Sequence, residues 1–176
     1  MNRKTRYWVR RVLMLLMVGA VAFAIYKTMS GGEKQTVEEE MEAPDFQLQT
    51  LEGKELKLSA LRGQTVLLNF WASWCEPCRD EMPAIEKVYE KHKEKGLVVV
   101  GINIAESKLT VKGFVRQLDL SFPIVLDKER KVVDQYQIGP IPTSIFIDKE
   151  GRVVRNVKGQ MDENQLETYV LEALSR

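Results

Sequence analysis

The sequence predicts an α/β domain with a central mixed β-sheet over residues 43–176, preceded by a single transmembrane helix. Three observations lead to this class. Short apolar runs alternate with helical patterns along the domain, and strands interleaved with helices build α/β sheets. The last two apolar runs are joined by a tight turn, which adds an antiparallel pair and makes the sheet mixed. Two cysteines lie three positions apart, where an apolar run meets a helical pattern.

A basic segment and an apolar run open the chain. Residues 1–11 carry five Lys or Arg side chains, and Val12–Tyr26 is uncharged and ends at Lys27. Fifteen helical residues rise about 22 Å, short of a hydrocarbon core of about 30 Å, but flanking aromatic and basic side chains close much of the gap. We therefore predict a transmembrane signal-anchor at residues 12–27. Basic residues stay on the cytoplasmic side, so the N-terminus is expected inside and the domain outside.

A cleaved signal peptide is the main alternative to the anchor, because Ala22-Phe23-Ala24 resembles a small-residue cleavage site. A buried core helix is disfavoured by the basic cluster in front of it. An anchor and a signal peptide both place the domain outside the cytoplasm. Residues 28–42 follow, with Ser-Gly-Gly and then an acidic stretch, and we interpret them as a solvated, flexible linker.

The charge of the chain is unevenly distributed. Of 26 Lys and Arg residues and 25 Asp and Glu residues, six basic ones and no acidic ones lie in residues 1–32. The remainder therefore has 20 basic and 25 acidic residues, a formal charge of −5. Binding to nucleic acid needs clustered positive charge, so the sequence predicts no nucleic-acid partner.

Strands and helices alternate through the domain. Uninterrupted apolar runs predict strands, and apolar residues that recur every three or four positions predict helices. Gly96 ends the first helix, and Asp162 with Gln165 resembles a capping box that opens the last one. The predicted strands are 65–71, 97–104, 122–126, 143–148 and 152–157, and the predicted helices are 77–95, 109–118, 128–136 and 162–174.

Cys75 and Cys78 are the chain's two cysteines, and we predict that they form a redox-active pair. The start of a helix presents free N–H groups and a partial positive charge, which favour the thiolate of Cys75. Pro77 suits the first turn because it has no N–H to leave unpaired. The expected cycle is attack by Cys75 on a partner disulfide, formation of a mixed disulfide, and release by Cys78.

Other uses of two cysteines fit less well. With the single histidine, His92, they supply fewer than the four ligands of a zinc site, so no metal is expected. Arg79 occupies the position that covalent haem attachment reserves for histidine. An inert disulfide would close a very small loop and add little stability. We expect no cofactor, and we interpret His92, which lies in a charged run, as a solvated helix residue.

The stretch Val66–Arg79 resembles the thioredoxin-like proteins closely. Pro83 matches the proline that bends the active-site helix of that family. Ile141-Pro142-Thr143 is similar to the family's cis-proline loop, which packs against the cysteine pair and offers backbone groups to the partner; a trans proline that starts a strand is the alternative. The resemblance implies a thioredoxin-like fold, and we assign as substrate-binding residues Trp74, Glu76, Pro77, Ile141 and Pro142.

The first residues of the domain indicate one branch of the thioredoxin-like family. Ala43-Pro44-Asp45-Phe46, Gly53-Lys54 and Leu58–Gly63 resemble the extracytoplasmic branch of the family, which adds an N-terminal hairpin and an insert in the middle of the core. Residues 105–121 fit that insert. Peroxiredoxins share the Ala-Pro-Asp-Phe opening, but they place a lone peroxidatic cysteine in a different kind of loop, so a peroxidase is disfavoured.

Two positions depart from cytoplasmic thioredoxin. Asn69 stands where thioredoxin keeps a buried aspartate, so that proton acceptor is missing. Glu81 follows Cys78 by three residues, on the same helical face, and the extracytoplasmic branch resembles this in having a glutamate there. We expect Glu81 to raise the thiol pKa values and to move protons during exchange, which makes it catalytic together with Cys75 and Cys78. A solvated helix glutamate is the alternative.

The resemblance implies a reductant that opens the disulfide of apocytochrome c at its Cys-x-x-Cys-His haem-attachment motif. It also implies that electrons arrive from the cytoplasm through an integral-membrane thiol–disulfide carrier (CcdA-like), and that the domain lies on the outer face of the cell membrane. Thiol–disulfide exchange is reversible, so the residues define the chemistry more firmly than its direction. A general or sporulation-related reductase, an oxidase and a non-catalytic binding module are the alternatives.

Overall fold

The computed structural model describes Trp8, Arg11, residues 13–19, Val21 and residues 40–176, and it divides the chain into two units, Met1–Lys34 and Gln35–Arg176. The described residues of the first unit are helical. In the part of the chain that the structure describes, no helix has the length and apolar character needed to cross a membrane. Much of the predicted anchor at residues 12–27, and residues 28–39 of the predicted linker, lie outside the described residues.

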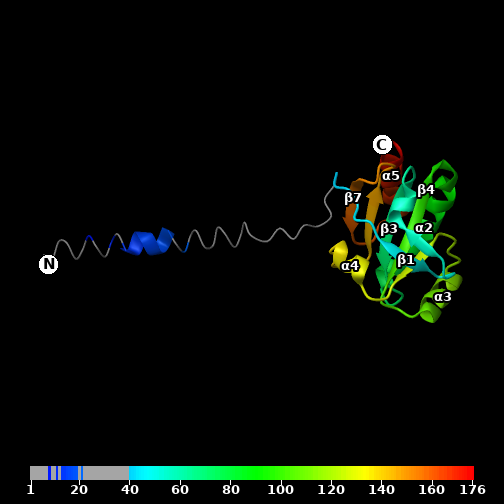
Figure 1. Ribbon diagram of the computed structural model, residues 1–176, viewed down its shortest axis with the longest axis horizontal. Coiled ribbons are helices and arrows are strands. Elements are labelled where there is room, and N and C mark those ends of the chain that lie inside the picture. The colour runs from blue at the N-terminus through cyan, green and yellow to red at the C-terminus, as the bar shows by residue number, and fades with distance from the viewer. Residues whose placement is uncertain (1–7, 9–10, 12, 20, 22–39) are drawn as a thin grey trace. The chain divides into compact units, whose positions relative to one another are not determined.

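The second unit is built on one seven-stranded mixed sheet with the strand order β2-β1-β5-β4-β3-β6-β7 (Figure 1). Strand β3 pairs parallel with β4, and β4 with β5, whereas the other neighbours are antiparallel. This arrangement confirms the mixed sheet that the sequence predicts. The strands are β1 (Gln47–Thr50), β2 (Glu55–Lys57), β3 (Thr65–Trp71), β4 (Leu97–Ile104), β5 (Ile124–Asp127), β6 (Thr143–Ile147) and β7 (Val153–Lys158).

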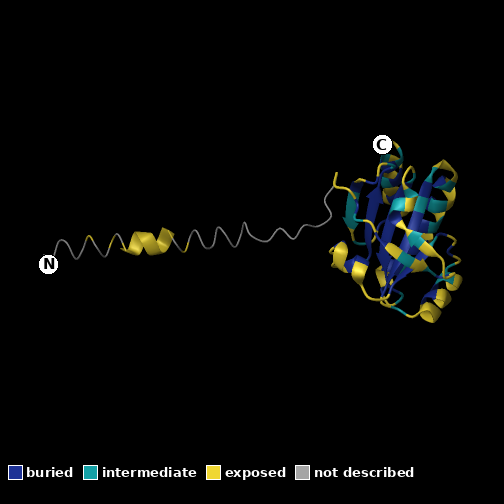
Figure 2. Cartoon of the chain, in the orientation of Figure 1, coloured by how far each residue is buried: buried dark blue, intermediate teal, exposed yellow. Residues whose placement is uncertain are grey.

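Helices cover both faces of the sheet, and its central strands β3, β4, β5 and β6 are buried between them (Figure 2). Alternation along β3 assigns the faces, since successive side chains of a strand point to opposite sides. Leu67 and Trp71 join the core under α2, α3 and α5, whereas Leu68 and Phe70 join the core under α4 and η1. The helices are α2 (Glu76–His92), α3 (Lys108–Gln117), α4 (Lys131–Gln135) and α5 (Glu163–Leu174), with the 3-10 turns η1 (Leu58–Leu61) and η2 (Lys93–Lys95).

Most predicted elements of the domain are confirmed, with ends shifted by a few residues. The predicted strand 97–104 coincides with β4, and Asp162 and Gln165 form the predicted capping box of α5. The predicted helix 77–95 divides into α2, which ends at His92, and the 3-10 turn η2, which ends at Gly96 in the left-handed conformation, at φ 94°. Helix α4, predicted at 128–136, begins three residues later than predicted, because Arg130 also adopts a left-handed φ and cannot belong to a right-handed turn.

The start of the domain forms the hairpin that the resemblance implies. Strands β1 and β2 pair antiparallel, and β1 adds to the sheet beside β5. Three residues of the predicted linker also belong to the folded unit. The Glu40 N–H donates to the Val153 carbonyl at 2.7 Å, and the Val153 N–H donates to the Met41 carbonyl at 2.8 Å. Residues 40–42 thus extend the folded unit along β7.

His92 is buried, which contradicts the prediction of a solvated residue. Its side chain is 1% exposed, and Nε2 lies 3.3 Å from Glu167 Oε1 of α5. The lysines on either side of it, Lys91 and Lys93, ion-pair near the surface. Because neighbouring residues of a helix differ by about 100° in direction, a charged run can surround an inward-facing residue.

The capping box fixes the start of α5 and supports one prediction. Replacing Asp162 with Ala removes the acceptor for the Gln165 N–H, so we expect the free energy of unfolding to fall by about 1 kcal/mol. Chemical denaturation monitored by circular dichroism measures this change. Asn164→Ala, in the same helical turn but without a capping bond, is the matched control and should leave the midpoint nearly unchanged. Equal losses in the two variants would refute the capping role.

Candidate active site

Cys75 and Cys78 lie where β3 leads into α2, and they are joined by a disulfide with an S–S distance of 2.06 Å. Cys75 is the N-cap of α2, and its Sγ accepts the Cys78 N–H at 3.2 Å. Cys75 is 6% exposed and Cys78 is fully buried. A partner can therefore reach Cys75 alone, where free N–H groups and the helix dipole stabilise a thiolate.

The loop that precedes β6 lies against this pair. The Ile141–Pro142 peptide bond is cis, which confirms the cis-proline loop and excludes the trans alternative. The Ile141 carbonyl oxygen is 3.8 Å from Cys75 Sγ. Ile141 is half-buried and Pro142 is buried. The structure thus brings Ile141 and Pro142, which are more than 60 positions away in sequence, to the cysteine pair.

The residues beside the cysteines form an exposed rim. The Trp74 side chain is 72% exposed, and Glu76 and Pro77 are also exposed. The Arg79 guanidinium instead covers the ring of Phe114 in α3, 4.7 Å from its centroid. Trp74, Glu76 and Pro77 are therefore available for contact with a partner, whereas Arg79 helps to hold α3 against α2.

Glu81 is buried under the cysteines, not solvated. Its side chain is 1% exposed, and its two carboxylate oxygens accept hydrogen bonds from the Met161 N–H at 3.0 Å and from Asn69 Nδ2 at 3.2 Å. Burial raises the pKa of Glu81 to about 7, because removing the carboxylate from water outweighs the two hydrogen bonds that stabilise its charge. The group can therefore gain or lose a proton near neutral pH.

Asn69 links Glu81 to the sheet. The β3–β6 register places it opposite Ser144, and its Nδ2 donates to both Ser144 Oγ, at 3.0 Å, and Glu81 Oε2. Among the described residues, nothing donates to its Oδ1. A half-turn of the amide would present Oδ1 to a protonated Glu81, so an asparagine can serve either protonation state of the acid. An aspartate would add a second buried charge.

One carboxylate beside the redox loop, that of Glu106, was not expected from the sequence. Glu106 follows β4 and accepts hydrogen bonds from the Ser73 N–H at 2.7 Å, from Ser73 Oγ and from Asn103 Nδ2 at 2.7 Å. The predicted sheet topology could have indicated the position of Glu106. Since β3 and β4 are parallel, their carboxyl ends meet at one edge of the sheet, and residues that follow both strands come together there.

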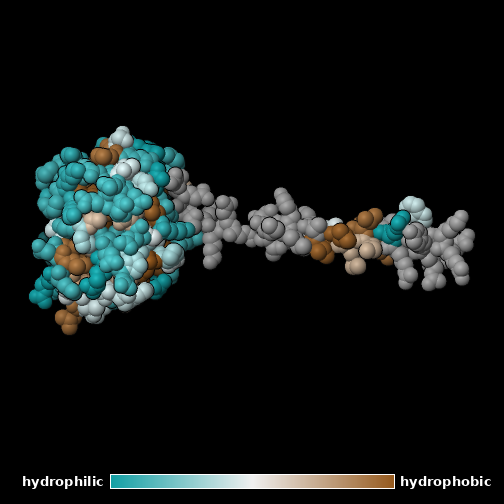
Figure 3. Space-filling view, turned by 180° about the vertical axis from the view of Figure 1, so that it is seen from behind, coloured by the Kyte–Doolittle hydropathy of each residue, from teal (hydrophilic) through white to brown (hydrophobic). Residues whose placement is uncertain are grey.

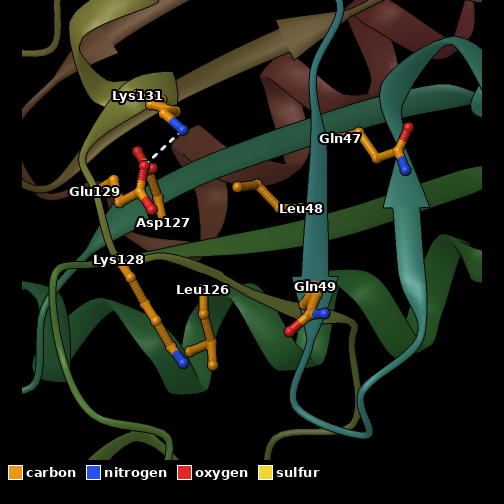
Figure 4. A pocket seen from close by; sticks show the side chains of 8 residues that line it. All are labelled: Gln47, Leu48, Gln49, Leu126, Asp127, Lys128, Glu129 and Lys131. Atoms are coloured by element: carbon orange, nitrogen blue, oxygen red, sulfur yellow. Dashed lines mark ion pairs between the residues drawn. The ribbon is translucent and has the colours of Figure 1, made fainter.

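Two surface pockets of the domain lie away from the cysteine pair. Polar residues cover most of the face seen in Figure 3. A pocket of about 250 Å³ lies beside β1 and the segment after β5, but its lining includes neither cysteine, and its Glu129 and Lys131 pair with each other (Figure 4). No group of three or more His, Cys, Asp or Glu side chains in the described residues is placed to hold a metal ion.

A disulfide at the start of a helix, a cis proline beside it and a buried acid beneath it define a thiol–disulfide oxidoreductase of the thioredoxin fold. Comparison with known proteins agrees. Residues 40–156 match the AhpC/TSA family. The chain is 41% identical to a thiol-disulfide oxidoreductase ResA of Bacillus cereus over 96% of both chains, and 38% identical to that of Bacillus subtilis over 97% of this chain and 94% of the relative.

Solved structures give the same picture. The crystal structure of a thiol:disulfide interchange protein of Chlorobium tepidum aligns with a TM-score of 0.71 and 29% identity, over 78% of this chain and 98% of that one. StoA of Bacillus subtilis aligns with a TM-score of 0.64 and 31% identity, over 72% and 96%. The chain therefore belongs to the AhpC/TSA family, among the thiol–disulfide oxidoreductases that include ResA. Its enzymatic activity is protein-disulfide reduction by thiol–disulfide exchange.

The raised pKa of Glu81 makes stability depend on pH. The unfolded carboxyl ionises near 4.5, whereas the folded one stays protonated up to about 7. Folding therefore binds a proton between these values, and stability falls as pH rises from 4.5 to 7. We expect the unfolding free energy of the oxidised protein, measured relative to Glu81→Gln, to drop by about 3 kcal/mol across this range.

Denaturant titrations of both proteins from pH 4 to pH 8 measure this difference. The glutamine variant controls for all other titrating groups, because its amide stays neutral throughout. Parallel curves for the two proteins would show that Glu81 titrates normally and would overturn the prediction.

Proposed function

We propose that this protein is an extracytoplasmic reductase, held at the outer face of the cell membrane by its N-terminal segment, that opens the disulfide of the apocytochrome c Cys-x-x-Cys-His motif. The observation that carries the proposal is the similarity to ResA over 96% of both chains, which extends into the basic and apolar N-terminal segment. An anchor at residues 12–27 with five basic residues before it would keep the N-terminus in the cytoplasm.

The chemistry begins with the reduced cysteine pair. The Cys75 thiolate attacks one sulfur of the substrate disulfide, so a Cys75–substrate bond forms and the second substrate sulfur leaves as a thiolate that takes up a proton. Cys78 then loses its proton and attacks Cys75 Sγ, which releases the first substrate sulfur. The substrate gains two electrons and two protons, and the pair returns to the disulfide state of the structure.

The two cysteines differ in environment as these roles require. Cys75 reaches the surface and occupies the helix N-cap, where its thiolate is stabilised. Cys78 is fully buried, so it can attack a mixed disulfide formed at Cys75 but cannot be reached by a second protein. Electrons would return to the pair through an integral-membrane thiol–disulfide carrier.

Glu81 is suited to accept the proton that Cys78 loses. It lies one turn after Cys78 on α2 and is closed off from water. A base works best when its pKa is near the working pH, and the pKa of Glu81 is about 7. When ionised, the carboxylate raises the pKa of a neighbouring thiol, which would make the thiol a stronger nucleophile once deprotonated.

The exposed rim suits a haem-attachment segment. Trp74 offers a flat apolar surface beside the reactive sulfur, and the carboxylate of Glu76 can pair with the protonated histidine of Cys-x-x-Cys-His. The cis-proline loop lies against Cys75 and would contact the backbone of an extended partner through Ile141 and Pro142.

A trapping experiment tests the substrate. In Cys78→Ser the mixed disulfide cannot be resolved, so we expect apocytochrome c to accumulate as a covalent complex with Cys75, visible on a non-reducing gel and identified by mass spectrometry. Cys75→Ser/Cys78→Ser is the control and should trap nothing. If exported proteins other than apocytochrome c were trapped instead, the protein would be a general or sporulation-related reductase.

The direction of electron flow has its own test. We expect the full-length protein, equilibrated with thiol–disulfide buffers, to show a reduction potential near or below the value of about −270 mV known for thioredoxin, because a reductant must give up its electrons readily. A potential near the value of about −120 mV known for DsbA would instead identify an oxidase. The ratio of free to disulfide-bonded cysteines, read by alkylation, gives the potential.

A further inference from the structure

The loop between β3 and Cys75 is held by a carboxylate from another part of the chain. Its turn is closed by the Cys75 N–H, which donates to the Ala72 carbonyl at 3.2 Å. Ser73, inside the turn, gives both of its polar groups to Glu106: the N–H at 2.7 Å and the hydroxyl at 2.5 Å. Trp74, the next residue, is 72% exposed, so its place depends on the backbone on either side of it.

Glu106 is itself held in place by the end of β4. Asn103, fully buried in β4, donates to Glu106 Oε2 at 2.7 Å, and the β3–β4 register places it beside Trp71. Ala105 adopts a left-handed φ of 56°, a sharp turn that side chains rarely allow, and it directs the chain back from β4. The hydrogen bond from Asn103 and the turn at Ala105 thus place this carboxylate against the redox loop.

The insert, residues 105–121, also contacts the active-site helix α2. Ser107 caps α3, its Oγ accepting the Thr110 N–H at 3.2 Å. In the same helix Phe114 packs against Trp71, with ring centroids 4.6 Å apart, and beneath the Arg79 guanidinium. The inserted helix is therefore fastened to both ends of the redox motif, before Cys75 and after Cys78.

We propose that Glu106 is a positioning residue for thiol–disulfide exchange, which locks the insert to the Ala72–Cys75 turn and so holds Trp74 and Cys75 in register with the cis-proline loop for a protein partner. A protein disulfide must fit against Trp74 and Ile141 while its sulfur lines up with Cys75. A small disulfide only has to bring one of its sulfurs into line with Cys75. Glu106 therefore favours protein partners over small ones, and this role holds for any protein disulfide, whether or not apocytochrome c is the substrate.

The other end of the insert provides a matched control. There the Glu86 carboxylate of α2 accepts the Ser121 N–H at 2.9 Å and the Ser121 hydroxyl, the same pair of contacts that Glu106 makes with Ser73. Glu86 lies two turns beyond Cys78. Replacing it frees the Ser121 N–H without touching the redox loop, while the Ser121 hydroxyl keeps its bond to Glu90 at 3.1 Å.

The experiment uses the full-length chain in detergent, as Glu106→Ala, Glu106→Gln and Glu86→Ala. Amide hydrogen exchange, followed by NMR, reports whether each serine N–H is released. Second-order rate constants of the reduced protein with insulin and with oxidised glutathione report on a protein and a small disulfide. Circular dichroism establishes that each variant is folded.

In Glu106→Ala we expect Ser73 exchange to accelerate while Ser121 is unchanged. We expect the insulin rate to fall about tenfold and the glutathione rate by less than about twofold, because misplacement of about 1 Å costs well-oriented reactions this much or more. Glu106→Gln should recover most of the insulin rate, since its carbonyl can accept the Ser73 N–H and its amide can donate to the hydroxyl. Glu86→Ala should release Ser121 and leave both rates unchanged.

Three results would overturn the role of Glu106: a normal insulin rate once Ser73 is released, equal losses with insulin and glutathione, or an equal loss in Glu86→Ala. If Glu106→Ala does not fold, Ser73→Ala takes its place, because it removes only the hydroxyl contact and leaves Asn103 bound to Glu106. It should lower the insulin rate alone, by about twofold to threefold, and unchanged insulin kinetics in that variant would equally refute the proposal.

Discussion

The acceptance of the Cys78 N–H by Cys75 Sγ is the interaction on which the site depends. This hydrogen bond makes the reactive sulfur the N-cap of α2. The sulfur therefore lies where β3 leads into α2, at the positive end of the helix dipole. The same geometry exposes Cys75 slightly and buries Cys78 completely. The different roles of the two cysteines, attack by Cys75 and resolution by Cys78, thus follow from their positions on one helical turn.

Glu81 shows how the fold sets chemistry through burial. A carboxylate in the first turns of a helix would ordinarily be solvated and ionised, but α2 packs this face against the sheet and the start of α5. Desolvation then outweighs the hydrogen bonds from Met161 and Asn69, and the acid titrates near neutrality. Through this group the protein loses stability as pH rises from 4.5 to about 7, and it holds a proton acceptor beneath the cysteines, a combination common at catalytic sites.

The insert, residues 105–121, supports the exposed loop that carries Trp74. Glu106 and Phe114 attach it on either side of the redox motif, so the loop that carries Trp74 is braced by residues over 30 positions further along the chain. Parallel pairing of β3 and β4 makes this possible, since it brings the two strand ends to one edge of the sheet. A rigid rim around a small reactive opening is what distinguishes recognition of a protein disulfide from exchange with any available thiol.

Local patterns in the sequence determined the α/β class, the order of strands and helices from Thr65 onward, and the pairing of Cys75 with Cys78 at a helix start, because periodicity, turn residues and caps act over a few positions. Resemblance added the cis proline and the importance of Glu81. Only the tertiary structure decided that His92 and Glu81 are buried and that Glu106 meets Ser73. Burial and long-range contact depend on which helix face meets which strand end, and a single sequence does not display that geometry.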